Sequence, residues 1–159
     1  MSEVVVAGGA MTPFNRRKDG SGMRDWARAA FFDALSDARL EARDIDALVV
    51  ASESDFFTLQ LNPAALIADE LGLFGIAAQR VEGGGASGHL AVHAGAAMVM
   101  AARARRVAVV GLEPSASHLP GAAVGALYGL SFDAWTDGMT GIDSTSLYAL
   151  SVQAFTEET

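Results

Sequence analysis

A run of glycines stands in the middle of the chain, between a short β-type segment and a long apolar segment. Glycine occupies positions 83–85, and Ala86, Ser87 and Gly88 follow directly. Because glycine accepts a positive φ and lets a ligand approach the backbone, the pattern predicts a strand, a tight turn and a helix. The first turn of such a helix has free N–H groups at the positive end of its dipole. We therefore expect a phosphate or an oxyanion to bind at Gly84, Gly85, Ala86 and Ser87.

The glycine run does not match the common nucleotide-binding patterns. A Walker loop has Lys-Ser or Lys-Thr after its glycines, and neither pair follows here. A dinucleotide fingerprint normally follows the first strand of its domain, whereas this run follows the third predicted strand. The sequence therefore argues against a nucleotide at this turn.

Three side chains close to the turn could take part in chemistry. His89 falls in the first helical turn, where it could face a substrate and carry a proton. His93 lies four residues further on, and two histidines at this spacing can bind a metal. No third ligand is evident, so we expect no metal site. We expect His93 to be a hydrogen-bonded residue of the core instead. Ser87 could be a nucleophile, but no base is near it in the sequence. A serine in the first turn usually caps the helix, so we expect a structural role.

The elements that must position these residues alternate along the first 114 residues. The expected strands are 4–9, 44–51, 79–82 and 107–111, and the expected helices are 24–40, 62–71 and 86–104. This alternation predicts an α/β fold with a parallel sheet and helices on both faces. An irregular segment follows over 116–143 and carries Tyr128, Phe132 and Trp135, and a helical pattern resumes at 144–158.

Composition limits the classes of function. The chain has 159 residues, a net charge of -8 and no cysteine. The charge argues against nucleic acid and anionic membranes as partners, and the missing cysteine excludes disulfides and a thiolate nucleophile. The longest apolar tract, 90–102, is shorter than the roughly 20 residues of a membrane span, and no cleavable leader is evident, so we expect a cytoplasmic protein. The helix at 86–104 is apolar on every side and must be covered on every side.

Several motifs together resemble the thiolase superfamily, in its sterol-carrier-protein type. They are Met11-Thr12-Pro13-Phe14, the segment 82–88, Gly111-Leu112-Glu113, Gly138-Met139 and Tyr148-Ala149-Leu150. The resemblance implies the N-terminal half of a thiolase-like αβαβα fold. Residues 1–114 would form the N-terminal α/β domain and 115–159 the start of the loop domain that covers the substrate. The family's C-terminal half, with its catalytic motifs, is absent from these residues.

The resemblance also implies a chemistry, with one departure. Gly85 stands where the family has its nucleophilic cysteine, and glycine has no side chain to acylate. The expected activity is therefore retro-aldol cleavage of a β-hydroxyacyl-CoA without an acyl-enzyme, as in thiolase-like aldolases that work with a small OB-fold partner. CoA would enter only as part of the substrate, with no tightly bound cofactor, and the acids and bases would lie beyond residue 159.

Alternatives remain open at this point. The chain could be a non-catalytic scaffold or an acyl-CoA-binding subunit, or an ordinary acyltransferase whose cysteine comes from elsewhere. Tyr128, Phe132 and Trp135 could line an apolar acyl pocket or simply anchor their loop. The family pairs its third strand across a two-fold axis, so the resemblance implies a homodimer through Gln79 to Gly83.

Overall fold

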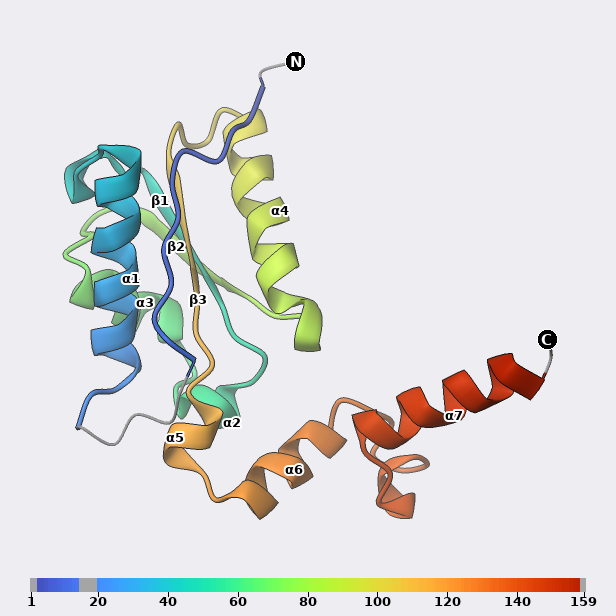
Figure 1. The fold of residues 1–159 in the computed structure, drawn as a ribbon. Helices are drawn as coiled ribbons and strands as arrows, with labels where there is room; N and C mark the ends of the chain where they lie inside the picture. The colour runs from blue at the N-terminus through green and yellow to red at the C-terminus, as the bar shows by residue number, and fades with distance from the viewer. Residues whose placement is uncertain (1–2, 15–19, 158–159) are drawn as a thin grey trace. The chain divides into compact units, whose positions relative to one another are not determined.

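The computed structural model describes residues 3–14 and 20–157, which fall into two compact units, 1–117 and 118–159. In the first unit, three parallel strands form a sheet in the order β2-β1-β3 (Figure 1). They are β1 (Ala47–Ala51), β2 (Ala77–Val81) and β3 (Val107–Gly111). The predicted α/β fold with a parallel sheet is therefore confirmed.

The register of the sheet aligns the ends of its strands. Ala51 at the end of β1 is paired with Val81 of β2 and with Gly111 of β3. The Leu112 N–H then donates a hydrogen bond to the Ala51 carbonyl at 2.9 Å. The residues that follow all three strands consequently leave the sheet at one edge, where ligands of parallel α/β sheets usually bind.

Helices cover both faces of the sheet, as the alternating pattern predicted. Figure 1 shows α1 (Met23–Ala38) and α3 (Pro63–Glu70) on one face and α4 (Ser87–Met100) on the other. The first face packs Leu48, Val50 and Val110 against the two helices, and the second packs Val49 and Ala51 against Ala91 of α4. The side chains of a parallel strand are apolar on both faces because both are covered.

Local sequence explains where α3 begins and ends. The Asn62 side chain accepts a hydrogen bond from the Ala65 N–H at 3.3 Å, and Pro63 occupies the first helical position. Proline is favoured there because the missing N–H would have no partner in the helix. Gly72 follows the helix with a φ of +69°, which glycine adopts without strain. Both predicted signals are confirmed.

The prediction of a buried strand at 4–9 is wrong. This segment has no place in the hydrogen-bonded ladder, and the Val6 side chain is 86% exposed. It contacts α1 instead: the Gly9 N–H donates to Asp37 Oδ2 at 3.0 Å, and a Cβ on Gly8 would lie 2.7 Å from the Ala38 nitrogen. β-branched residues favour a pleated, half-buried surface, and tertiary contacts decide whether they obtain one.

The second unit is more helical than its sequence suggested. It contains α6 (Gly121–Gly129), a 3-10 turn η3 (Gly138–Thr140) and α7 (Ser144–Glu157), while the short α5 (Ser115–His118) lies at the junction of the units. The expectation of an irregular segment at 116–143 is therefore wrong for α5 and α6: α5 is only four residues long, and α6 contains three glycines, which concealed the helical pattern. In neither described range is a helix both long and apolar enough to cross a membrane.

Candidate active site

The glycine run forms the predicted strand–turn–helix. Strand β2 ends at Val81, a 3-10 turn η2 (Gly84–Ala86) follows, and α4 begins at Ser87. Gly84 has a φ of +56°, a left-handed conformation that explains the glycine at this position. Within this turn the Ala86 N–H donates to the Gly83 carbonyl and the Ser87 N–H to the Gly84 carbonyl. The N–H groups of Gly84 and Gly85, at the start of the 3-10 turn, have no carbonyl of a preceding turn to bond, so they are available to an anionic atom. The helix begins one residue later and ends four residues earlier than predicted, at Met100.

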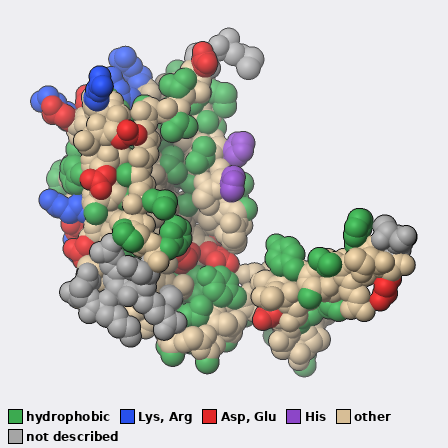
Figure 2. Space-filling model, in the orientation of Figure 1, with side chains coloured by type: hydrophobic (Ala, Val, Ile, Leu, Met, Phe, Trp, Pro, Cys, Tyr) green, Lys and Arg blue, Asp and Glu red, His purple; other side chains and the backbone are tan. Residues whose placement is uncertain are grey.

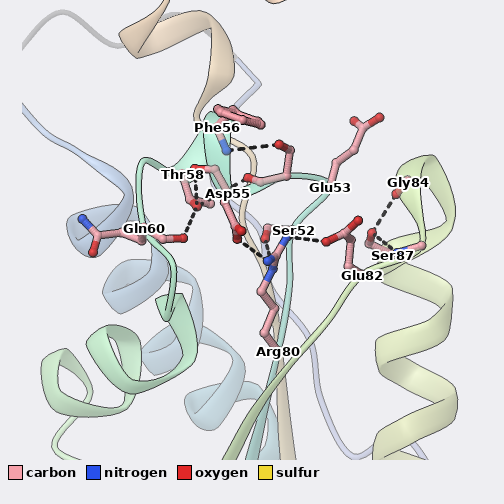
Figure 3. A network of polar contacts seen from close by, with 12 residues as sticks. Ser52, Glu53, Asp55, Phe56, Thr58, Gln60, Arg80, Glu82, Gly84 and Ser87 are labelled. Atoms are coloured by element: carbon pink, nitrogen blue, oxygen red, sulfur yellow. Dashed lines mark hydrogen bonds and ion pairs between the residues drawn. The ribbon is translucent and has the colours of Figure 1, made fainter. Parts of the chain in front are cut away.

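Ser87 holds the turn in shape. Its hydroxyl oxygen accepts the Gly83 N–H at 3.0 Å and donates to the Gly84 carbonyl at 2.7 Å (Figure 3). The residue is only 5% exposed. A buried hydroxyl that is already a donor and an acceptor within the turn fits the expected structural role better than that of a nucleophile.

Gly85 differs from the other two glycines of the run. It is exposed, its φ is not positive, and a Cβ built on it would meet nothing within 4 Å. At Gly83, in contrast, a Cβ would collide with the Leu90 side chain. The backbone therefore does not require glycine at position 85, and the missing side chain leaves an open space at the start of the helix.

Arg80 joins the segments around the turn. Its Nε donates to Ser52 Oγ at 2.9 Å, and its two terminal nitrogens pair with Asp55 and with Glu82 (Figure 3). Asp55 begins the short helix α2 (Asp55–Thr58) after β1, and Glu82 directly precedes the glycines. The Arg80 side chain, 17% exposed, thus ties the segment after β1 to the residue directly before the glycine turn. Sequence reasoning missed Arg80, although a charged residue within an apolar strand was a usable signal.

Glu82 is the last residue before the glycines, and its side chain is 55% exposed. Its Oε2 accepts a hydrogen bond from Arg80 Nη2 at 2.9 Å, so the carboxylate forms an ion pair with a cation two residues earlier in the chain.

Glu113 lies at the same edge, two residues beyond β3. Its Oε2 accepts the Glu53 N–H at 2.7 Å, which ties the segment after β3 to the segment after β1. Desolvation is the main reason why the pKa of Glu113 is raised to about 7. The hydrogen bond from the Glu53 N–H lowers this pKa, the negative charge of the Glu53 carboxylate raises it, and the positive charge of Arg80 lowers it. A carboxyl with such a pKa can hold or release a proton near neutral pH. The sequence pointed to Glu113 only as part of a family motif.

The two histidines lie on the outer face of α4 (Figure 2). His89 is exposed, as its expected role requires, but the prediction of His93 as a core residue is wrong, because it is exposed as well. The helix contacts the sheet through Ala91 and Gly95, where a methyl group and a bare backbone permit close approach. Positions 89 and 93 lie on the opposite side of the helix and therefore face outward. Leu90 and Val92 are also exposed, so the residues that the structure describes do not cover α4 on every side, as the sequence predicted that it must be. Among residues 3–14 and 20–157, no three His, Asp or Glu side chains lie together as metal ligands would.

The three aromatic candidates belong to the second unit. Tyr128 lies on α6, and Phe132 and Trp135 follow it, with Trp135 86% exposed. Asp133 organises this segment by accepting the Trp135 N–H at 2.8 Å. Their place in an acyl pocket stays a prediction.

The fold and the turn define a parallel α/β domain in which a glycine turn leads from the sheet edge into a packed helix. The family described as "Thiolase, N-terminal domain" matches residues 4–143. The chain therefore belongs to the thiolase N-terminal domain family. The expected family and the observed fold agree.

Two individual proteins illustrate the relationship. The chain is 40% identical over 96 residues to an acetyl-CoA acetyltransferase of Methanothermobacter thermautotrophicus, an alignment that covers 60% of the chain and 25% of that enzyme. It is 21% identical to 3-oxoacyl-[acyl-carrier-protein] synthase III of Aquifex aeolicus VF5, with a TM-score of 0.54 over 60% of the chain and 31% of that structure. The first similarity agrees with the family match, and the second concerns the fold alone. The aligned part spans about a quarter of the curated relative.

Proposed function

We propose that the protein containing this chain cleaves a carbon–carbon bond of a β-hydroxyacyl-CoA by a retro-aldol reaction, without an acyl-enzyme. The observation that carries the proposal is Gly85. The family match includes the glycine turn. Gly85, which the resemblance places at the family's nucleophile position, has no side chain, although the backbone there would accept one. A site that keeps its anion-binding turn but has no nucleophile is suited to polarising a thioester and unsuited to acylation.

The reaction needs three groups. A base removes the proton of the β-hydroxyl, the Cα–Cβ bond breaks, and a carbonyl compound leaves. The electron pair of that bond moves into the thioester, which becomes an enolate, and an acid then protonates Cα. N–H groups of the first turn at Gly84 and Gly85 are placed to stabilise the oxyanion of the enolate. We assign His89 as a candidate proton carrier because it is exposed in the first turn of α4.

We also propose which molecules the protein binds and how it assembles. CoA would enter as part of the substrate, and a small OB-fold protein would be a partner. A homodimer would form through Gln79 to Gly83, because β2 is an edge strand of the described sheet and its first three residues are exposed. An edge strand offers unpaired N–H and C=O groups to a second copy. We place the complex in the cytoplasm.

The test uses the full reading frame, co-expressed with its neighbouring genes and purified as a complex. The complex is assayed on a β-hydroxyacyl-CoA and on the matching β-ketoacyl-CoA, with mass spectrometry of the quenched protein. Cleavage of the hydroxy substrate with no acyl adduct, insensitive to iodoacetamide, is the expected result. A complex that binds CoA and turns over neither substrate would overturn the proposal in favour of a scaffold. An acyl adduct on a partner cysteine would indicate an acyltransferase.

A further inference from the structure

Five of the eleven Lys and Arg residues lie at the end of the sheet opposite to the glycine turn. We call them the arginine edge: Arg39, Arg43, Arg103, Arg105 and Arg106. Arg39 ends α1, Arg43 precedes β1, and the other three stand between α4 and β3. Figure 2 shows blue side chains gathered over these ends of the elements. The concentration is unusual in a chain whose net charge is -8.

The carboxylates at this edge serve mainly to hold the backbone. Asp46 Oδ2 accepts the N–H groups of Arg105 and Arg106, both at 2.9 Å, and these hydrogen bonds lower the pKa of Asp46. Asp44 Oδ2 likewise accepts the Glu41 N–H at 2.9 Å. The edge is thereby fixed in shape by its acids, and the positions of the arginines are set by the fold.

Three of the five guanidinium groups are not paired with these acids. Arg43 pairs with Glu41 at 2.9 Å, and Arg106 Nη1 lies 4.0 Å from Asp44. Arg39, Arg103 and Arg105 are exposed, and each lacks an ion pair with any residue of the described ranges. The dipoles of α1 and α4 favour cations near Arg39 and Arg103, but they do not account for Arg105 or Arg43.

A hollow of about 350 Å³ opens beside the arginine edge. Its lining includes Ala42, Ile45, Leu73 and Ile76, and Arg43 belongs to both features. The Phe74 side chain at its rim is 75% exposed. An open hollow with a partly apolar and partly polar lining, an exposed aromatic ring and neighbouring guanidinium groups has the composition of a site where a protein anchor residue binds.

We propose that the arginine edge docks an acidic segment of a partner protein, with one apolar side chain of that segment in the hollow. The unpaired guanidinium groups select carboxylates, and Arg43 joins the charged and apolar parts. The acidic charge of the rest of the chain disfavours a polyanion as long as nucleic acid. Because five-residue strands separate the two ends of the sheet by about 16 Å, the docked segment leaves the glycine turn free.

The test measures fluorescence anisotropy with two short peptides of Glu and Asp, one carrying a central Leu and the other a Ser at that position. The full reading frame is compared with the double variant Arg103→Glu/Arg105→Glu. The matched control is Arg24→Glu/Arg28→Glu, which makes the same change in charge on α1 beside Glu70. Circular dichroism checks that each variant is folded. Inorganic pyrophosphate and vesicles of phosphatidylserine serve as competitors.

We expect the Leu peptide to bind about tenfold more tightly than the Ser peptide, because the Leu side chain buries apolar area worth about one to two methylene groups that Ser does not bury. The Arg103→Glu/Arg105→Glu variant should lose at least about tenfold in affinity, and the control should lose less than about threefold. Equal binding of the two peptides, or equal losses in both double variants, would overturn the proposal and indicate unspecific attraction. Full displacement by pyrophosphate, or by the vesicles, would overturn it in favour of a simple anion site or a lipid surface.

Discussion

Replacing Gly85 by cysteine gives a direct measure of the field at the glycine turn. The chain has no cysteine, so the variant carries a single thiol. A Cβ at this position meets nothing within 4 Å, and φ is not positive, so no steric cost arises. The unfolded chain loses backbone freedom on the change from glycine, which should stabilise the fold by about 0.4–1 kcal/mol.

The reactivity of the new thiol follows from the helix terminus. The start of α4 carries the positive end of the helix dipole, which favours a thiolate. Lowering the thiol pKa by about one raises the thiolate population at neutral pH about eightfold. A thiolate with a lower pKa is intrinsically less nucleophilic, which reduces the rate of alkylation about threefold. The net increase in the alkylation rate is therefore about threefold.

The assay is the rate of alkylation by iodoacetamide at neutral pH, followed by mass spectrometry. The matched control is Ser36→Cys, an exposed position in the last turn of α1, where the dipole has the opposite sign. We expect Gly85→Cys to react at least about threefold faster than this control. Equal or slower alkylation would refute the reasoning that the turn stabilises negative charge, and with it the role of the turn in binding an oxyanion. Destabilisation by more than about 2 kcal/mol would refute the open geometry at position 85.

Three further substitutions test the framework of the site by urea denaturation. The raised pKa of Glu113, about 7, means that the folded chain binds the proton more tightly than the unfolded chain. Protonated Glu113 therefore adds to the free energy of unfolding, by about 1–2 kcal/mol after solvent screening. This stabilisation is complete below about pH 4.5 and is lost as the pH rises to about 7. Glu113→Gln should remove that part of the pH dependence, and an unchanged slope would contradict it. Arg80→Met leaves Asp55 and Glu82 without their cation and should cost about 2–4 kcal/mol, against less than about 0.5 for the exposed control Arg43→Met. Gly84→Ala, at a φ of +56°, should cost about 1–2 kcal/mol, whereas Gly85→Ala should stabilise the fold by about 0.4–1 kcal/mol, as expected for cysteine there; equal effects would contradict the assigned backbone.

Much of the fold could be predicted because it depends on local patterns. β-branched runs predicted β1 and β3, Asn62 and Pro63 predicted the start of α3, and the glycine run predicted the turn before α4. Each of these signals acts over a few residues, through backbone conformation or a cap, and needs no distant partner. The family followed from the order of the motifs, which the match over residues 4–143 confirms.

The errors fall where distant contacts decide the outcome. The segment 4–9 has the composition of a strand, yet its hydrogen bond goes to Asp37 of α1 and not to the sheet. His93 follows the apolar pattern of α4, but the contacts of Ala91 and Gly95 with the sheet turn it outward. Helical periodicity states which residues share a face, and only packing decides which face is inside.

By itself, the sequence determined the α/β class, the glycine turn and the absence of a thiol nucleophile. These features depend on residue type and on neighbours along the chain. The tertiary structure alone decided that Arg80 would join Ser52, Asp55 and Glu82 around that turn, and that Glu53 would donate to Glu113 from 60 residues away. The register of three parallel strands brings these groups to one edge, and a register is a property of paired strands that no single segment encodes.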